Sequence, residues 1–163
     1  MTEWVGEVVP FLSWPHTKKA QRMLKIFHHQ FTVPEEALDE NGHVNNVVYV
    51  QWMQDVALEH SNALGCNSDL YRKLGTLWVA RSHYIEYRSP AFAGDRIDLL
   101  TWVSDLKRSS SLRKYKWLRT RDQKVLAQAE TKWVYVSAKT GRPCTIHDEV
   151  MNLFSIVSVD DEP

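Results

Sequence analysis

An acid, an amide and an imidazole stand at alternate positions in the first third of the chain, as Asp39, Asn41 and His43. A carboxylate can act as a general base on water if it reaches the proton that it must take. Asn45 and Asn46 follow, and either can cap the free backbone N–H groups of a helix start. Those N–H groups favour developing negative charge. The segment therefore predicts an acid close to a site that stabilises an oxyanion.

Each of these residues also has a purely structural interpretation. Asp39, Asn41 and Gly42 are common turn formers, because their residue types suit bends and positive φ. A single histidine such as His43 is most often satisfied within the fold, and the two asparagines are explained as caps. What favours chemistry is the combination of acid, amide and imidazole at i, i+2 and i+4, directly before a helix.

The element that must position these side chains is a long helix over about residues 47–64. Apolar residues recur at helical spacing from Val48 through Trp52 and Val56, and Gly65 supplies a left-handed stop. The apolar arc is wide, so we expect the helix to be substantially buried rather than to lie on the surface.

Strands are predicted around this helix. Residues 24–33 form a first strand, which Pro34 ends. The short links between the later candidates imply antiparallel neighbours. These strands are expected over about 77–88, 95–106, 112–121 and 125–137, with short helical pieces near 69–74 and 146–154, the second starting at a capping box of Thr145 and Asp148. The order of elements is α+β, with a sheet that wraps one central helix.

The composition is that of one soluble globular domain. We expect an N-terminal arm over 1–23, a domain over 24–157 and a frayed acidic tail over 158–163. The 20 basic and 20 acidic residues cancel, so no global field favours nucleic acid or an acidic membrane. Cys66 and Cys144 are expected to be reduced. Neither a signal peptide nor a membrane span of about 20 apolar residues is evident, so a cytoplasmic location is expected.

Other candidates for chemistry are weaker. His28 and His29 should face opposite sides of a strand, so they cannot share a metal. No metal site, phosphate loop or serine nucleophile elbow is expected. Four basic residues surround one predicted hairpin end, either as a solvated turn or as a contact for the phosphates of a carrier such as coenzyme A. They are Lys107, Arg108, Arg113 and Lys114.

The segment from Asp39 to Trp52 closely resembles the signature of hotdog-fold acyl thioesterases, namely the 4-hydroxybenzoyl-CoA thioesterase-like and acyl-acyl-carrier-protein thioesterase families. The resemblance extends over about residues 24–155. The segment from Pro90 to Asp95 is similar to the family's link between its second and third strands. The resemblance implies a hotdog fold, in which a curled antiparallel sheet wraps a long helix. It also implies a homodimer or homotetramer with active sites at the subunit interface, and no cofactor.

The resemblance also implies roles for individual residues. Asp39 matches the catalytic carboxylate, as nucleophile or general base, and the backbone N–H of Asn46 matches the group that polarises the thioester carbonyl. Asn41 and His43 match positions that orient the acid or water, and Gly42 keeps the loop close to substrate. An acid often follows on the helix, where this chain has Gln54, Asp55 and Glu59. We expect Val48, Tyr49, Met53 and Leu58 to shape the acyl pocket, and Arg108 and Arg113 to contact the carrier.

The predicted function is therefore hydrolysis of an acyl-CoA or acyl-carrier-protein thioester. Three alternatives stay open at this point, because fold does not fix function. They are a hotdog dehydratase, a catalytically silent thioester-binding module and a structural domain that binds no thioester.

Overall fold

The computed structural model describes residues 25–163, so the predicted N-terminal arm lies outside the described residues. Five strands form one antiparallel sheet in the order β1-β3-β4-β5-β2. Every predicted strand is present, and each described boundary lies within two residues of the prediction. The strands are β1 (Ile26–Thr32), β2 (Thr76–Tyr87), β3 (Arg96–Leu106), β4 (Ser110–Arg119) and β5 (Lys124–Ser137).

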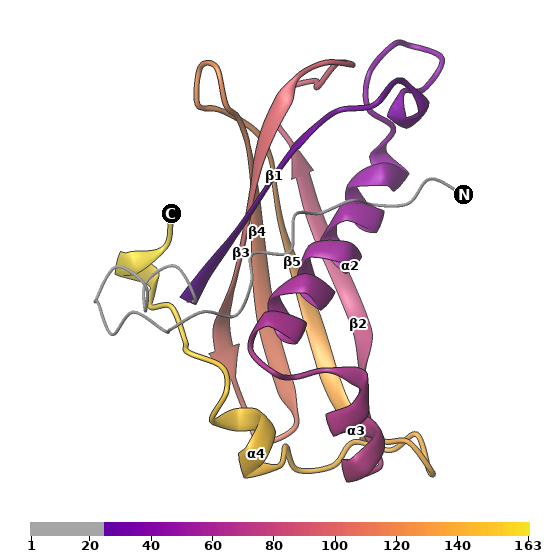
Figure 1. The fold of residues 1–163 in the computed structure, drawn as a ribbon, viewed down its shortest axis with the longest axis vertical. Coiled ribbons are helices and arrows are strands. Elements are labelled where there is room, and N and C mark those ends of the chain that lie inside the picture. Colours follow the sequence, from indigo (N-terminus) through magenta and orange to yellow (C-terminus); the bar gives the residue numbers. More distant parts are fainter. Residues whose placement is uncertain (1–24) are drawn as a thin grey trace.

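The long helix α2 (Asn46–Ala63) lies across one face of this curled sheet (Figure 1). Its start is fixed by Asn45, whose side chain accepts a hydrogen bond from the N–H of Val47. Its end is followed by Gly65 in the left-handed conformation, at φ +86°. Both features were predicted. The predicted α+β arrangement of one long helix against a curled antiparallel sheet is therefore confirmed. Burial of the helix is less extensive than expected: six of its 18 residues are buried, and Val47 and Leu58 are 71% and 52% exposed, because only one side of α2 meets the sheet.

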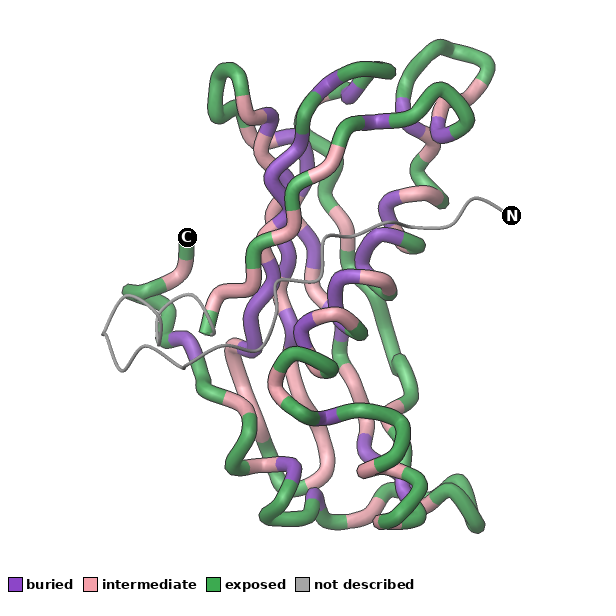
Figure 2. The backbone as a smooth tube through the Cα atoms, viewed as in Figure 1, coloured by how far each residue is buried: buried purple, intermediate pink, exposed green. Residues whose placement is uncertain are grey.

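The core lies between α2 and the inner face of the sheet. Met53 and Val56 of the helix are each 1% exposed, and Trp117 and Leu126 of the sheet are fully buried. Burial of a large apolar side chain contributes about 1.5–3 kcal/mol, so this contact accounts for much of the stability that holds α2 in place. Figure 2 shows the buried residues following α2 and the central strands.

Four short helical elements complete the described part of the fold. They are η1 (Glu35–Ala37), α3 (Ser68–Leu74), α4 (Asp148–Met151) and η2 (Val159–Asp161). The predicted capping box of α4 is wrong, because its N-cap is His147, without a side-chain cap bond. The hydroxyl of Thr145 instead accepts a hydrogen bond from Arg108 at 3.0 Å. Because the helix begins at Asp148, Thr145 lies two residues before the N-cap and does not cap it.

The segment that leads into the acidic tail pairs with β3, and the tail, which we expected to fray, makes an ion pair with β4. Ile156 forms a parallel bridge with Val103 of β3, and the N–H of Val157 donates to the carbonyl of Val103 at 2.9 Å. Further on, Lys114 donates to both carboxylate oxygens of Glu162, at 2.7 and 2.9 Å. Pairing with β3 and a two-point ion pair explain the order of this segment.

The sheet ends at β2, and most residues of this strand are exposed (Figure 2). This strand is 12 residues long and carries four apolar side chains that are about 40% exposed or more: Leu77, Val79, Tyr84 and Tyr87. A long, apolar, unpaired edge is a template for pairing with another strand. Both cysteines are free thiols, as predicted. No helix in residues 25–163 is long and apolar enough to cross a membrane.

Candidate active site

The loop that carries Asp39 is a tight reversal of the chain just before α2. Leu38 and Val44 form an antiparallel bridge, and the N–H of Asp39 donates to the carbonyl of His43 at 2.8 Å. The N–H of Gly42 donates back to the carbonyl of Asp39 at 3.0 Å. Gly42 takes φ +76°, a conformation that a residue with a Cβ adopts only at a cost. The predicted turn chemistry therefore produces the reversal that presents the acid.

The carboxylate of Asp39 is oriented by the main chain of its own loop. Its Oδ1 accepts hydrogen bonds from the backbone N–H of Asn41 at 2.8 Å and, more weakly, of His43 at 3.4 Å. Its Oδ2 has no hydrogen-bond donor among residues 25–163. One oxygen is thus fixed while the other is available to water or substrate. This is the arrangement that a general base or a carboxylate nucleophile requires.

The side chains of Asn41 and His43 do not hold the acid. Both residues are exposed, and neither side chain has a hydrogen bond to Asp39 in the described part of the chain. The ring of His43 instead meets the ring of Phe92 edge-on, with centroids 5.2 Å apart. The three predicted residues are therefore brought together in one loop, but the backbone orients the acid, and the imidazole is placed by an aromatic contact that the sequence did not reveal.

The start of α2 supplies N–H groups beside this loop. The side-chain oxygen of Asn45 accepts a hydrogen bond from the N–H of Val47 at 3.0 Å. The N–H of Asn46, in contrast, has no acceptor within residues 25–163. The carbonyl of Asn46 accepts a hydrogen bond from the hydroxyl of Tyr87 at 3.1 Å. An unpaired N–H at the positive end of an 18-residue helix favours a developing negative charge.

The segment from Pro90 to Asp95 packs against the loop that carries Asp39 and is hydrogen-bonded to it. The N–H of Val44 donates to the carbonyl of Ala91 at 3.0 Å. Asp95, which is 7% exposed, accepts from the N–H of Phe92 at 3.1 Å. Its carboxylate also lies 3.7 Å from Arg119 and 3.6 Å from Arg121. This segment carried part of the family resemblance, and its position explains why, since it fixes both the motif loop and Phe92.

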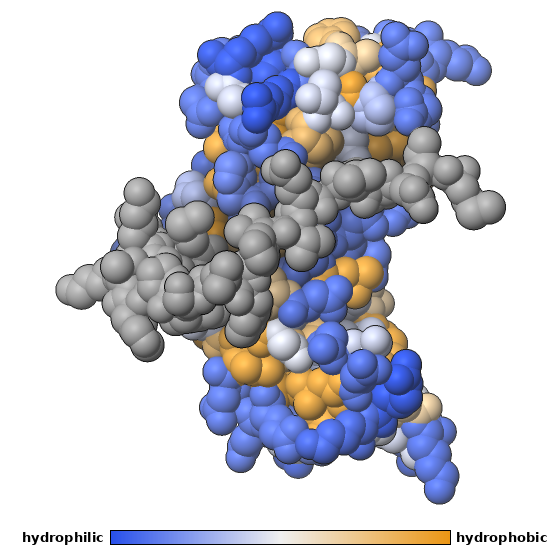
Figure 3. Space-filling model, in the orientation of Figure 1, coloured by the Kyte–Doolittle hydropathy of each residue, from blue (hydrophilic) through white to orange (hydrophobic). Residues whose placement is uncertain are grey.

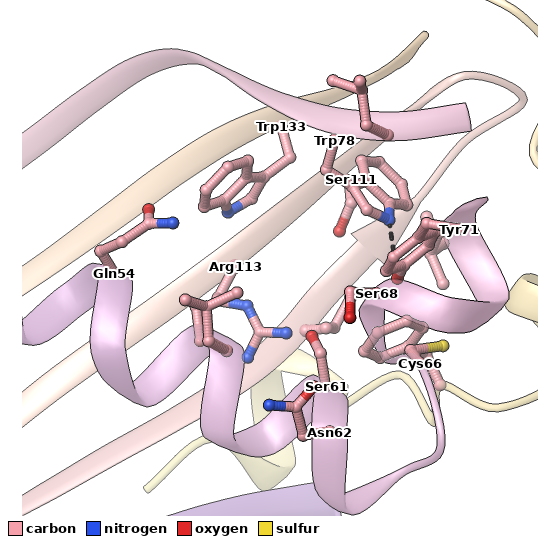
Figure 4. A pocket seen from close by; sticks show the side chains of 16 residues that line it. Gln54, Ser61, Asn62, Cys66, Ser68, Tyr71, Trp78, Ser111, Arg113 and Trp133 are labelled. Carbon is pink, nitrogen blue, oxygen red and sulfur yellow. Dashed lines mark hydrogen bonds between the residues drawn. The ribbon is translucent and has the colours of Figure 1, made fainter. Parts of the chain in front are cut away.

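A cavity of about 350 Å³ opens toward the other end of α2. Apolar side chains gather on this part of the molecule, between α3 and α4 (Figure 3). Both polar and aromatic residues line it (Figure 4). The lining residues are Gln54, Ala57, Leu58, Ser61, Asn62, Cys66, Ser68, Tyr71, Leu77, Trp78, Val103, Leu106, Ser111, Arg113, Trp133 and Phe154. At 1.5 Å per residue, Ser61 lies roughly 22 Å along α2 from Asn46, so within one chain the loop and the cavity are well separated.

The helix presents different residues to this cavity than the sequence predicted. Tyr49 and Met53 are 3% and 1% exposed, and they pack in the core without lining the cavity. Burial raises the pKa of the Tyr49 hydroxyl to about 12, so it stays protonated. Val48 packs against the same core. None of these three residues lines this cavity, because their arc of the helix faces the sheet, and their role in shaping an acyl pocket stays a prediction. Leu58 does line it and is 52% exposed.

The candidate acids on the helix have other contacts. Asp55 accepts a hydrogen bond from Gln51 at 2.8 Å, and Glu59 forms an ion pair with His29 at 2.8 Å. Neither lines the cavity, whereas Gln54 does. His28 pairs with Asp98 instead, at 2.9 Å. The prediction that the two histidines face opposite sides of β1 is confirmed.

The predicted basic cluster does not exist as one surface. Arg113 is buried, 4% exposed, and faces α2, while Lys114 points to the opposite face and binds Glu162. Arg108 stays exposed at the hairpin, where it contacts Thr145. Alternation along β4 separates neighbouring residues onto two faces of the sheet. The prediction of a common basic surface from residues that are close in sequence is therefore wrong.

Two curated proteins are similar to this chain in sequence. Acyl-(acyl-carrier-protein) hydrolase FATB3 of Cuphea viscosissima is 25% identical over 135 residues, which cover 79% of this chain and 32% of that protein. L-carnitine dehydrogenase/betainyl-CoA thioesterase of Ruegeria pomeroyi is 28% identical over 118 residues, which cover 72% of this chain and 24% of that protein. The chain thus spans about a third or less of the length of these curated relatives.

A solved structure shares the fold. The hypothetical protein SAV2348 from Staphylococcus aureus, solved in complex with CoA, superposes with a TM-score of 0.74 at 17% identity, over 78% of this chain and 80% of that one. The predicted hotdog fold is confirmed. Residues 33–154, more than half of the sequence, match the family model of the thioesterase-like superfamily, and the chain belongs to that superfamily.

Proposed function

We propose that this protein hydrolyses an acyl thioester, with Asp39 as the acting carboxylate and the start of α2 as the group that polarises the carbonyl. The observation that carries the proposal is the state of the Asp39 side chain, in which Oδ1 is held by two backbone N–H groups and Oδ2 has no donor within residues 25–163. The N–H of Asn46 supplies the oxyanion contact at the same end of the helix. Both halves of the chemistry thus come from one loop and the helix that follows it.

Two routes are compatible with this arrangement. In one, Asp39 takes a proton from water, the resulting hydroxide attacks the thioester carbon, and the C–S bond breaks to give acid and thiolate. In the other, Oδ2 attacks that carbon directly, thiolate leaves, and water hydrolyses the mixed anhydride. In both, negative charge develops on the carbonyl oxygen before thiolate departs. The N–H of Asn46 stabilises this intermediate and the transition state that leads to it.

A second copy of the chain completes the site in this proposal. The edge of β2 is long, carries four exposed apolar side chains and has no pairing strand on its outer side within residues 25–163. Antiparallel pairing of two such edges about a twofold axis places the last residues of one β2 beside the first residues of the other. Tyr87 at the last end touches Asn46, and Leu77 and Trp78 at the first end line the cavity. The dimer therefore brings the reactive loop of one copy to the cavity of the other, which a single chain does not achieve.

The carrier of the acyl group is coenzyme A or an acyl carrier protein. Support comes from the similar proteins, which include an acyl-carrier-protein hydrolase and a betainyl-CoA thioesterase, and from the similar structure solved with CoA. Arg108 is exposed at the hairpin and remains a candidate contact for carrier phosphates. Because these relatives are thioesterases by name, neither a dehydratase nor a silent binding module is favoured.

The test is thiol release from a panel of aliphatic and aromatic acyl-CoA thioesters, with wild type and Asp39→Asn side by side. Hydrolysis by wild type that collapses in the variant supports the proposal. If no CoA thioester is cleaved, acyl-carrier-protein thioesters are tested as substrates next. Absence of release from both carriers, with a dimeric and folded protein, would contradict it.

A further inference from the structure

The cavity contains one charged side chain, and that charge is buried. Among the described residues that line it, Arg113 is the only ionisable group that is always charged, and no carboxylate lines the space. In Figure 4 its guanidinium lies among Gln54, Trp133, Ser61 and Asn62. Arginine is almost never fully buried unless it is paired, so an exposed fraction of 4% calls for an explanation.

The partners of Arg113 in the described part of the chain are neutral or aromatic. One nitrogen, Nη1, donates to Nδ1 of His60 at 2.9 Å and to the hydroxyl of Thr101 at 3.2 Å. The guanidinium carbon lies 6.0 Å from the ring centroid of Phe154, a cation–π contact. No acid lies within ion-pair distance among residues 25–163. A guanidinium has five N–H donors in a fixed fork, so Nη2 and Nε are left without protein acceptors there.

This environment suits an anion that comes from outside the chain. Burial lowers the pKa of Arg113, which means that the protein bears a cost for keeping a charge at this position. A carboxylate entering the cavity would accept two parallel N–H donors and offset that cost. The hydroxyls of Ser61 and Ser111 and the rings of Trp78 and Trp133 line the rest of the space. They offer a mixed polar and aromatic wall to a short acyl chain.

We propose that Arg113 is a specificity residue for acyl groups that carry a second carboxylate, so that the preferred substrates are monothioesters of dicarboxylic acids. This proposal deepens and rests on the proposed function: the thioester end lies at the Asp39 loop of one copy while the free carboxylate reaches Arg113 in the cavity of the other. A volume of about 350 Å³ lies in the usual range for small-ligand sites. An acyl group with a fixed positive charge is disfavoured, because it would meet Arg113 with no neighbouring carboxylate to offset the repulsion.

The turnover experiment compares chain-matched substrates. Glutaryl-, adipyl- and suberyl-CoA are assayed beside pentanoyl-, hexanoyl- and octanoyl-CoA, with wild type, Arg113→Met, Arg113→Lys and the control Arg72→Met. Arg72 lies on α3 near the cavity, but its side chain is 76% exposed. We expect wild type to prefer the carboxylated member of a pair by at least ~10-fold in kcat/KM, a typical effect of charge-assisted hydrogen bonds. Arg113→Met should abolish that preference, Arg113→Lys should retain part of it, and Arg72→Met should leave it unchanged.

A binding experiment separates this proposal from the hydrolytic one. Thermal stabilisation by hexanoate and by its neutral amide, hexanamide, is measured for wild type and Arg113→Met, with folding checked by circular dichroism. Stabilisation by hexanoate alone that disappears in Arg113→Met supports an anion site even if no thioester is hydrolysed. Equal stabilisation by the two ligands, equal behaviour of wild type and Arg113→Met, or hydrolysis with no preference for a carboxylated chain would overturn the proposal. If Arg113→Met fails to fold, Arg113→Lys is compared instead, and stabilisation by hexanoate is then expected to weaken without disappearing, because a lysine keeps the charge but not the paired N–H donors.

Discussion

The hydroxyl of Tyr87 donates a 3.1 Å hydrogen bond to the carbonyl oxygen of Asn46, and so joins the last residue of the edge strand to the first residue of the central helix. The two residues belong to separate parts of the proposed site, in which β2 would form the dimer edge and the N–H of Asn46 would supply the oxyanion contact. This hydrogen bond links the end of the edge strand to the helix start. The ring of Tyr87 also meets that of Tyr49 edge-on at 5.2 Å, which holds the hydroxyl in place.

Removal of that hydroxyl tests the connection. Tyr87→Phe keeps the ring contact and deletes one hydrogen bond, which typically contributes about 0.5–1.5 kcal/mol. We expect kcat to fall by about 2- to 10-fold with dimerisation unchanged, measured by steady-state kinetics and analytical ultracentrifugation. Tyr84→Phe, on the same strand and 65% exposed in wild type, is the matched control. Equal kinetics for wild type and Tyr87→Phe would show that this bond does not position the helix start.

Loss of the carboxylate at Asp39 should remove the activity without unfolding the protein. Asp39→Asn keeps the size of the side chain but abolishes its function as base or nucleophile, so turnover should fall by at least ~10²-fold. The control is Glu40→Gln, the same change at the adjacent exposed residue, which should alter turnover less than about twofold. Thiol release under saturating substrate measures both. Full activity of a folded Asp39→Asn variant would exclude Asp39 as the base or nucleophile.

The helix start depends on its cap. Asn45→Ala removes the acceptor for the N–H of Val47, and we expect unfolding free energy to fall by about 1 kcal/mol. Asn45→Ser restores an oxygen at the cap and should recover most of that loss. Urea unfolding followed by tryptophan fluorescence provides the comparison. Identical midpoints for wild type and the alanine variant would mean that tertiary packing alone fixes the first turn.

Charge at the β2 edge should separate the two copies. Val79 is 40% exposed on this strand, and Val79→Lys places like charges near each other across a twofold axis, which disfavours strand pairing. We expect the dimer to dissociate at micromolar concentration and specific activity to fall as the protein is diluted. Val159→Lys, at a residue 80% exposed on η2, is the control. A fully active monomer would contradict the composite site.

Asp98 should make stability sensitive to acid. Burial raises the pKa of this carboxyl, but hydrogen bonds from His28, Gln30 and Thr120 outweigh it, so the net pKa lies below its ordinary value of 3.8. A pKa that is lower in the folded state adds stability above the unfolded value, and that stability is lost as the pH falls through the folded value. The difference in unfolding free energy between wild type and Asp98→Asn should therefore be constant near pH 6 and shrink below about pH 4.

Urea unfolding at several pH values measures this dependence, with Asp160→Asn on the exposed tail as the control. A difference between wild type and Asp98→Asn that stays the same from pH 6 to pH 3 would exclude the linkage.

The fold was largely predictable from the sequence, because the signals that define its elements are local. The cap at Asn45, the left-handed Gly65 and the alternation of the strands act over a few residues, so the strands and the helix could be located without tertiary information. The turn at Asp39 and Gly42 was predictable for the same reason. The contact between His43 and Phe92 was not, since it joins two segments about fifty residues apart in sequence.

The cavity was missed for a related reason. The apolar arc of α2 is wide, so periodicity alone did not distinguish the side with Tyr49, which faces the sheet, from the side with Leu58, which lines the cavity. The error at Arg113 was different, because a usable signal existed. Strand alternation already implied that Arg113 and Lys114 point in opposite directions, and an arginine on the face with Tyr115 and Trp117 had to be buried.

The main-chain support of Asp39 gives the loop a particular freedom to diverge. Because backbone N–H groups hold the acid, the side chains at positions 41 and 43 carry no part of that task, and only the left-handed Gly42 is constrained by the bend itself. Substitutions at these two positions can therefore change the surface that faces an acyl group while the carboxylate of Asp39 keeps its orientation. In this loop, the conformation that orients Asp39 depends on the backbone and Gly42, whereas the side chains at positions 41 and 43 are free to vary.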